Sequence, residues 1–240
     1  EREYKAERRD RFILTLSIMD FLYLFGLWIS VLQISFVFIP LTFVLEWRKR
    51  GSTEGFSAVM LILPFLIMSC WMRFGLMTED TMMVVTNGIM LATSCVYLSI
   101  FISYTKDRTI VYSQIAAVLV SVVAVFAYVS SLNPEDQIDR MGAISGIVQN
   151  LRLIGALYQI KMVIDTKTTE YVPYTMQFIM IFFVSQMTLY AILSGNFYMA
   201  VGSIPGVILC VVNISLYIIY PPITWRVPIL GVQKKVEKSE

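Results

Sequence analysis

Long apolar windows separated by short polar connections run along most of this chain. The first window extends from Phe12 to Leu45 with Asp20 as its only charged residue. A bilayer core of about 30 Å is crossed by roughly 20 apolar residues in a helix, so this window is too long for one crossing, and we expect the first spanning helix to begin near Phe21. Further windows lie at residues 56–78, 81–105, 109–132, 140–161, 171–194 and 197–220. The pattern predicts an all-α membrane protein with seven transmembrane helices.

The composition excludes a water-soluble enzyme. Of the 240 residues, 57% are hydrophobic and 15% charged, whereas soluble domains carry about 25% charged residues. The chain contains no histidine, which removes His-dependent triads, imidazole zinc sites and proton relays. Cys70, Cys95 and Cys210 lie in apolar runs and are odd in number, so a disulfide framework is not expected. Since no Gly-rich phosphate loop or metal-ligand cluster is visible, we expect no enzymatic activity, no cofactor, no metal and no nucleic-acid partner.

Basic residues in the short connections predict the orientation, because Lys and Arg accumulate on the cytoplasmic side of membrane proteins. With the N-terminus outside, the cytoplasmic side receives eleven of these residues and the opposite connections receive only Arg140. The eleven are Arg48, Lys49, Arg50, Lys106, Arg108, Lys161, Lys167, Arg226, Lys234, Lys235 and Lys238. The first 20 residues carry five more basic side chains, which their acids partly offset. We therefore expect an extracellular N-terminus and a cytoplasmic C-terminus.

An internal repeat emerges when the sequence is aligned with itself at an offset of 116 residues. Both copies contain a polar turn ending in Thr-Glu, an apolar helix ending in an aromatic and a small residue, and a further helix that starts at Asp or Asn. The aligned positions are Gly51–Glu54 on Lys167–Glu170, Phe74 on Tyr190, Gly75 on Ala191, Asp80 on Asn196, Asn87 on Ser203 and Tyr104 on Tyr220. Four helices separate the copies, so both cross the membrane in the same direction.

The repeat predicts two parallel three-helix bundles joined by a linker helix, in the order three, one and three. The expected divisions are an extracellular lead at residues 1–20, a first bundle at 21–105, a linker helix at 106–133, a second bundle at 134–221 and a cytoplasmic tail at 222–240. Parallel repeats of this kind belong to a small set of transporters, whose substrates bind between the halves near the bilayer midplane.

Two segments of the chain resemble the SWEET family of sugar transporters and indicate a divergent, animal-type member. They are Lys49–Ser57, followed by Trp71–Gly75, Asp80, Asn87 and Tyr97, and Val163–Pro173, followed by Tyr190. The resemblance implies a facilitative uniporter of mono- or disaccharides in the plasma membrane, which works by alternating access without an ion or ATP. It also implies that the partners are a small-molecule sugar and the lipid bilayer, with formation of a homo-oligomer left open.

The resemblance further implies which residues form the site. The pocket asparagines of the family fall on Asn87 and, with a change of residue type, on Ser203, while its bulky pocket positions fall on Trp71 and Met187. The implied gate and hinge residues are Phe74 and Tyr190 with Asp80 and Asn196 at the outer gate, and Pro40 and Pro173 at the hinges. Two further hinge prolines of the family are replaced, by Met60 and Ala156.

These residue types suit a sugar, because its hydroxyls both donate and accept hydrogen bonds while its ring presents C–H bonds to an aromatic or thioether wall. Each residue also has a purely structural alternative. A membrane Asn such as Asn87 can form an interhelical hydrogen bond worth about 0.6–2 kcal/mol, and Trp71 can belong to an interfacial aromatic belt. Pro40 and Pro173 can mark helix ends. We favour the pocket for Asn87 and Ser203 because they occupy the same repeat position.

Two arginines lie inside predicted helices. Arg73 is near the outer end of its helix, where a long side chain can reach water. Arg152 lies one turn before Ala156, at a depth where a guanidinium is costly unless it is paired or lines a wet cavity. We expect Arg152 to face the transport pathway and to favour polyhydroxylated or anionic ligands.

Other seven-helix proteins fit the sequence less well. A retinal protein needs a lysine in the middle of its last helix, and residues 197–220 contain none. A proton-coupled carrier would place a carboxylate in the core of the helices, whereas Asp20, Glu79 and Asp80 lie at helix edges. The remaining alternative is a diverged, non-transporting sensor or receptor, or a transporter of another small polar solute.

Overall fold

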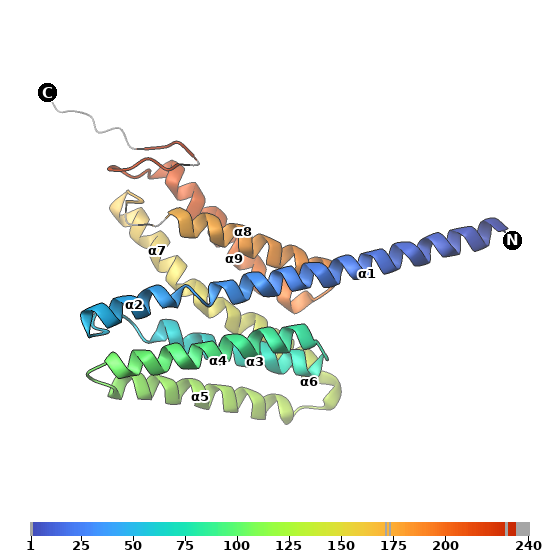
Figure 1. Ribbon diagram of the computed structural model, residues 1–240, viewed down its shortest axis with the longest axis horizontal. Coiled ribbons are helices and arrows are strands. Elements are labelled where there is room, and N and C mark those ends of the chain that lie inside the picture. The colour runs from blue at the N-terminus through green and yellow to red at the C-terminus, as the bar shows by residue number, and fades with distance from the viewer. Residues whose placement is uncertain (1, 171, 173, 229, 234–240) are drawn as a thin grey trace. The chain divides into compact units, whose positions relative to one another are not determined.

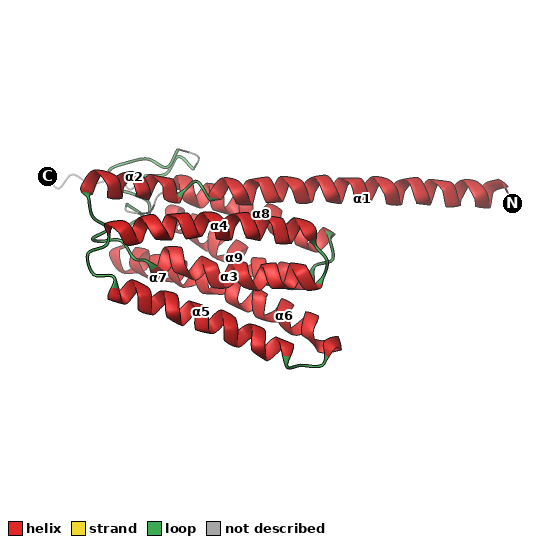
Figure 2. Cartoon of the chain, turned by 60° about the horizontal axis from the view of Figure 1, so that its bottom comes forward, coloured by secondary structure: helices red, strands yellow, loops and turns green. Residues whose placement is uncertain are grey.

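Helices joined by loops and turns make up the computed structural model over the residues it describes, which are 2–170, 172, 174–228 and 230–233 (Figure 2). Side chains are described from Met19 onward, apart from Met176. The helices are α1 (Arg2–Phe36), α2 (Pro40–Arg50), α3 (Val59–Met77), α4 (Thr81–Tyr104), α5 (Thr109–Ser130), α6 (Pro134–Gln149), the short 3-10 helix η1 (Asn150–Arg152), α7 (Leu153–Thr166), α8 (Tyr174–Leu193) and α9 (Phe197–Ile219) (Figure 1).

Five of the seven expected spans are single helices, since α3, α4, α5, α8 and α9 each fall within a predicted apolar window. The other two spans consist of α1 followed by α2 and of α6 followed by η1 and α7. The stretches long and apolar enough to cross a membrane by themselves are Met19–Arg50, Val59–Met77, Thr81–Tyr104, Thr109–Ser130 and Phe197–Ile219, with a shorter apolar stretch at Gln177–Leu193. The predicted all-α fold with seven helices is confirmed.

Two helices begin earlier than the apolar windows predict. α1 starts at Arg2, so the expected lead is helical and continuous with the first span over its described residues. Its Glu, Lys, Arg and Ala residues favour a helix without being apolar, which explains why the hydrophobic pattern does not detect it. α6 starts at Pro134 with Glu135 and Asp136 in its first turn. Proline fits a first helical turn, and acidic side chains there interact favourably with the helix dipole.

The first and fifth spans are interrupted. α1 ends at Phe36, and a turn at residues 37–39 precedes Pro40, the first residue of α2. A proline lacks an N–H and its ring clashes with the carbonyl four residues earlier, here that of Phe36, which accounts for the break. In the fifth span η1 breaks the helix at residues 150–152, although Ala156 stands at the repeat position of Pro40. Both copies of the repeat are therefore interrupted, with or without the proline.

The turn before the second helix of each copy has one conformation. Gly51 and Lys167 both adopt left-handed φ angles, of 65° and 53°. The next residue, Ser52 or Thr168, accepts a hydrogen bond on its hydroxyl oxygen from the N–H two positions later, at 3.1 Å and 3.2 Å respectively. In both copies this ST-turn follows the end of one helix and precedes the start of the next.

The start of the third helix in each copy is equally alike. Asp80 and Asn196 are N-caps with φ and ψ of −81° and 89° in one case and −80° and 88° in the other. Their side chains accept hydrogen bonds from Met83 N at 2.9 Å and Met199 N at 3.0 Å. Because two separate local motifs recur at the same spacing, the offset of 116 residues is a structural repeat.

The chain divides into two compact units. Unit 1 comprises Glu1–Ser145 and Leu193–Gly195, and unit 2 comprises Gly146–Ile192 and Asn196–Glu240. In unit 1, α3 lies beside both α4 and α5, while α1 and α2 pack against α4 (Figure 1). The expected linker helix, α5, thus belongs to unit 1. In unit 2, η1 and α7 pack against α9.

The core of unit 1 lies where α2 and α4 end and α3 and α5 begin. Trp47 is 2% exposed, and its ring meets Phe101 and Phe56 edge to face at centroid distances of 5.1 Å and 5.8 Å. Such aromatic pairs add about 0.5–1.5 kcal/mol each beyond area burial. The other buried members are Ala58, Leu61, Ile62, Tyr97, Leu98 and Val111. This cluster holds the polar turn of the first copy against the helix ends.

Residues after α9 fold back onto unit 2. Val227 is fully buried in the unit 2 core, and the indole N–H of Trp225 donates to the carbonyl of Glu170 at 3.3 Å. The Glu170 carboxylate accepts hydrogen bonds from the Thr224 hydroxyl and from the N–H groups of Thr224 and Ile223. The Thr224 hydroxyl, followed by these backbone donors, lowers the pKa of Glu170 below its usual value. The expected tail therefore starts with a packed segment over residues 222–228 and 230–233.

Candidate functional site

Unit 1 carries two of the predicted pocket residues, Trp71 on α3 and Asn87 on α4. The Trp71 ring is 6% exposed and meets Phe74 edge to face at 5.7 Å, while its indole N–H is buried without a hydrogen-bond partner among the described residues. Asn87 is half-buried, and its Nδ2 donates to the carbonyl of Met83 at 2.8 Å. The side-chain oxygen of Asn87 has no partner in the part of the chain that is described. These two positions thus offer a free donor and a free acceptor among the described residues.

The repeat partners in unit 2 are arranged differently. Met187 on α8 is half-buried. Ser203 on α9 is fully buried, and its hydroxyl donates to the Ala200 carbonyl at 3.0 Å and lies 2.9 Å from the hydroxyl of Thr188. Thr188 itself lies 2.8 Å from the carbonyl of Val184. The Ser203 hydroxyl is therefore satisfied between α8 and α9, and its direct contact with a sugar stays a prediction.

The expected outer gate combines buried rings with helix caps. Phe74 is buried, and Tyr190 is half-buried. Asp80 and Asn196 serve as the N-caps of α4 and α9, as described above. Capping explains why an acid or an amide stands at these two positions, since only such short polar side chains reach the free N–H groups. Their role in gating stays a prediction.

The expected hinges fall at helix boundaries. Pro40 begins α2 after the break in the first span, whereas Pro173 lies outside the described residues. The positions of the replaced prolines, Met60 and Ala156, lie within α3 and α7. Pro205 inside α9 was not predicted as a hinge, yet it leaves the carbonyl four residues earlier without its usual helical donor. A proline inside an apolar window was the available signal.

Arg152 lines a cavity of about 260 Å³ in unit 2. The cavity lies between η1, α7, α8 and α9, and Arg152 reaches it from the last residue of η1. Its lining residues are Arg152, Leu153, Ala156, Gln177, Met180, Val184, Gly206, Leu209, Cys210 and Asn213. No salt bridge joins Arg152 to an acidic side chain within the described residues. The sequence singled out Arg152 by the cost of its charge, and the structure adds the cavity beside it.

Two amides in this cavity were missed at the level of sequence. Asn213 on α9 is 5% exposed and has no hydrogen-bond partner for its side chain among the described residues. Gln177 on α8 donates from Nε2 to the Oε1 of Gln159 on α7 at 3.1 Å. Both are isolated amides in otherwise apolar helices, which is a signal that could have been used. The cavity therefore combines a cation with hydrogen-bonding groups and an apolar wall.

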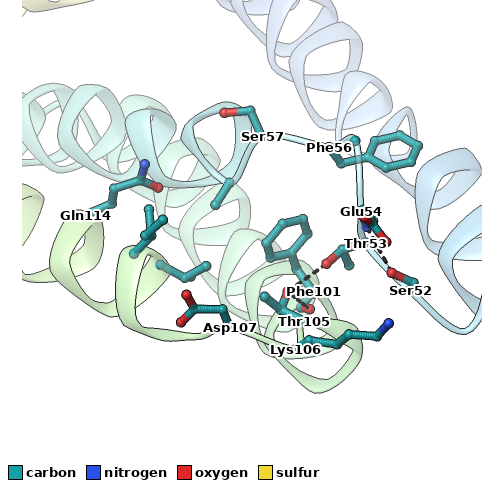
Figure 3. Close-up of a pocket in the computed structure, with 14 residues that line it drawn as sticks. Ser52, Thr53, Glu54, Phe56, Ser57, Phe101, Thr105, Lys106, Asp107 and Gln114 are labelled. Carbon is teal, nitrogen blue, oxygen red and sulfur yellow. Dashed lines mark hydrogen bonds between the residues drawn. The ribbon is translucent and has the colours of Figure 1, made fainter.

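A second cavity, of about 440 Å³, lies at the loop end of unit 1 (Figure 3). Residues 52–58 form one side of it, and the connection from α4 to α5 forms another. The hydroxyls of Thr53 and Thr105 lie 2.8 Å apart, and the Thr105 hydroxyl donates to the Phe101 carbonyl at 2.8 Å (Figure 3). The charged lining residues are Glu54, Lys106 and Asp107. Since their charges have both signs, this cavity has no clear preference for an anion or a cation.

Comparison with known families reproduces the repeat. A family model described as "Sugar efflux transporter for intercellular exchange" matches the chain twice, at residues 23–109 and 139–224. The two matches begin 116 residues apart, which is the spacing found within the sequence and in the local structure.

Individual relatives are similar over most of the chain. "Sugar transporter SWEET1" of Drosophila pseudoobscura pseudoobscura is 30% identical over 182 residues, covering 74% of this chain and 80% of the relative. "Bidirectional sugar transporter SWEET4" of Oryza sativa subsp. indica is 32% identical over 188 residues, covering 75% and 71%. The solved structure of a eukaryotic SWEET transporter matches with a TM-score of 0.71 at 23% identity, covering 83% of this chain and 96% of that one. This structural match supports the fold.

Proposed function

Because the chain belongs to the SWEET family, we propose that it is a uniporter that moves mono- or disaccharides across a membrane by alternating access between its two bundles. The observation that carries this proposal is the internal repeat, whose polar turns and helix caps recur at 116 residues. A parallel repeat with an interrupted helix in each copy suits a carrier in which two similar bundles move against each other around a substrate. The family consists of transporters and not of enzymes.

Uniport follows from where the charges are. The helices α4, α5, α8 and α9 contain no Asp, Glu, Lys or Arg, and α3 contains only Arg73. A coupling proton needs an ionisable side chain such as a carboxylate within the membrane, and these five helices supply no carboxylate. We therefore propose that the substrate gradient drives transport without a coupled proton.

We propose sugar contacts in each unit taken by itself. In unit 1, the free indole N–H of Trp71 and the free side-chain oxygen of Asn87 match the donor and acceptor capacity of sugar hydroxyls. In unit 2, Met187 supplies an apolar wall, and Ser203 supports the pocket by holding Thr188. Each of these side chains lies on a spanning helix.

The moving parts that we propose are the breaks and the outer ends of the bundles. Pro40 and η1 mark where the first and fifth spans are interrupted. We propose Pro173, which lies outside the described residues, as a further hinge. Phe74 and Tyr190, beside the caps Asp80 and Asn196, close the outer end. An extracellular N-terminus and a cytoplasmic C-terminus are inferred from the distribution of Lys and Arg, and residence in the plasma membrane is inferred from the family resemblance.

Sugar counterflow in proteoliposomes tests this proposal. Labelled glucose and sucrose are followed into liposomes preloaded with unlabelled sugar, without an ion gradient or ATP. We expect saturable counterflow for the wild-type protein and at least a tenfold loss in Asn87→Ala. Thr93→Val is the matched control, since Thr93 is a half-buried residue of the same helix whose hydroxyl, among the described residues, donates to the carbonyl of Ile89.

Absence of counterflow for every sugar with the wild-type protein would contradict transport and leave the sensor or receptor alternative. Equal counterflow in the wild type and Asn87→Ala would remove Asn87 from the pocket. A second candidate function, transport of another polar solute, is favoured by one observation, the unpaired guanidinium of Arg152 at the unit 2 cavity.

A further inference from the structure

We propose that the unit 2 cavity is an anion subsite, in which Arg152 binds the carboxylate or phosphate of a sugar-sized solute. This inference rests on the proposed transport function, and it assigns a substrate class to it. Three observations carry it. Arg152 has no countercharge among the described residues, it lies far from both ends of its span, and side-chain amides line the same cavity.

The first observation is that Arg152 has no countercharge among the residues that the structure describes. A guanidinium stays protonated in any protein environment and is stabilised inside a membrane only by pairing or by water. The neighbouring helices α8 and α9 contain no acidic residue. Asp165, on α7, is 13 residues further along the chain, or about 20 Å along a helix. The carboxylate of Glu170 is already bound by Thr224 and Ile223.

The second observation is the position of Arg152 in its span. It lies between α6 and α7, 12 residues after Arg140 and 9 before Lys161, which bound the predicted span, so the ends of the span are about 18 Å and 14 Å away along the helix. A side chain that leaves its helix at this point cannot reach either membrane surface by extending along the helix. Arg73 differs in position, because it lies four residues before the end of α3, and its guanidinium has an aromatic partner, 5.8 Å from the ring centroid of Phe126.

The third observation is the polar lining opposite the arginine. The amide of Asn213 is almost fully buried, lines the cavity and has no partner among the described residues. Gln177 is held in place by its hydrogen bond to Gln159. Amide N–H groups donate to the oxygens of a carboxylate or phosphate, and the apolar side chains of Met180 and Leu209 can face the C–H bonds of a sugar ring.

The ligand that satisfies all three observations is anionic. Neutral hydroxyls can accept hydrogen bonds from a guanidinium but leave its charge uncompensated, whereas charge-assisted bonds are roughly twice as strong. The planar fork of arginine also matches two oxygens of one carboxylate or phosphate. At about 260 Å³ the cavity is slightly below the usual 300–1,000 Å³ of a complete small-molecule site, which suits a subsite that takes one end of the solute.

Binding to the purified full-length protein in nanodiscs tests the inference. Glucuronate, glucose 6-phosphate and glucose are titrated separately, and the first two distinguish a carboxylate from a phosphate. We expect at least one of the two anions to bind tenfold or more tightly than glucose. Arg152→Met should abolish this preference, and Arg152→Lys should retain part of it, because lysine keeps the charge but loses the fork. Arg73→Gln is the matched control and should keep the full preference.

Two results would overturn the inference: no preference of the wild-type protein for either anion, or the same preference in Arg152→Met as in the wild type. Thermal unfolding of each variant shows whether it is folded, and Arg152→Gln replaces Arg152→Met if the latter unfolds. Glucose counterflow keeps the proposed function separate. Counterflow without Arg152-dependent anion binding contradicts only the subsite, and anion binding without any flux contradicts only the carrier.

Discussion

Trp71 and Trp47 are both buried tryptophans whose indole N–H groups have no acceptor among the described residues. A buried donor without a partner costs about 1–3 kcal/mol, so each must be offset by ring packing or by a ligand. For Trp47, the edge-to-face contacts with Phe56 and Phe101 supply the packing. Trp71 contacts Phe74 and stands at a predicted pocket position, which makes a sugar hydroxyl the acceptor that we expect.

The substitution Trp71→Phe separates packing from binding. It keeps an aromatic ring and removes the unsatisfied donor, so we expect thermal stability to stay the same or rise slightly. Loss of one hydrogen bond to the sugar, worth about 0.5–1.5 kcal/mol, should raise KM for glucose about 2- to 13-fold in the counterflow assay. Trp47→Phe removes the same kind of donor outside the pocket and should leave KM unchanged. Equal KM values for the wild type and Trp71→Phe would argue against Trp71 as a sugar donor.

Close packing between elements depends on glycine where α6 meets α9 in unit 2. A Cβ atom on Gly202 would lie 3.1 Å from the Cα of Gly146, 3.3 Å from Nε2 of Gln149 and 3.4 Å from the carbonyl oxygen of Gly146. Two of these three atoms are backbone and cannot move without shifting the helix. Small residues are typical of membrane helix interfaces because packing, and not the hydrophobic effect, holds such helices together.

A larger residue at Gly202 should therefore destabilise unit 2. Overpacking of a tight interface costs about 1–3 kcal/mol, and we expect Gly202→Val to lower the midpoint of unfolding accordingly. Gly155→Ala is the matched control, because a Cβ atom there meets nothing within 4 Å. That change should be neutral or stabilising, since alanine is favoured over glycine in a helix by about 1 kcal/mol. Detergent-titrated unfolding of both variants measures the difference, and an unaffected Gly202→Val would contradict the contact.

Across the whole molecule, the two copies of the repeat share local motifs but not side-chain chemistry. The polar turn and the cap before the third helix have the same geometry in both copies. In the first copy the side-chain oxygen of Asn87 has no hydrogen-bond partner among the described residues, whereas in the second copy the Ser203 hydroxyl is buried and hydrogen-bonded between α8 and α9. The second copy instead places its polar groups at Arg152 and Asn213. The two copies of the repeat therefore carry different polar side chains on a similar local backbone.

Exchange of the two caps tests how far the repeat extends. Asp80→Asn and Asn196→Asp should each retain stability, since the two side chains accept the same backbone bond. Asp80→Ala and Asn196→Ala should each cost about 0.5–2 kcal/mol in unfolding experiments. If the charge of Asp80 also serves the outer gate, Asp80→Asn will reduce counterflow without a loss of stability. Full counterflow in Asp80→Asn would restrict Asp80 to the capping role.

The sequence alone determined the membrane class, the seven spans and the offset of 116 residues. These features were predictable because a bilayer requires each crossing segment to satisfy its backbone hydrogen bonds internally. The length of each apolar run and the residues at its ends therefore determine the length and the ends of the helix. The N-caps at Asp80 and Asn196 lie where the repeat places them for the same reason. Arg152 was also identifiable, because an ionisable side chain in an apolar span is costly wherever it points.

Only the tertiary structure decided which side chains face each other. The pairing of Ser203 with Thr188, the cavity that unites Arg152 with Asn213, and the docking of Trp225 on Glu170 each join residues from different helices or loops. Hydrophobic patterns fix the length of a helix but not its rotation or the bends within it, and the break at η1 has no proline to mark it. Contacts across helices depend on that rotation, which is set by packing of the whole unit and not by any one segment of the chain.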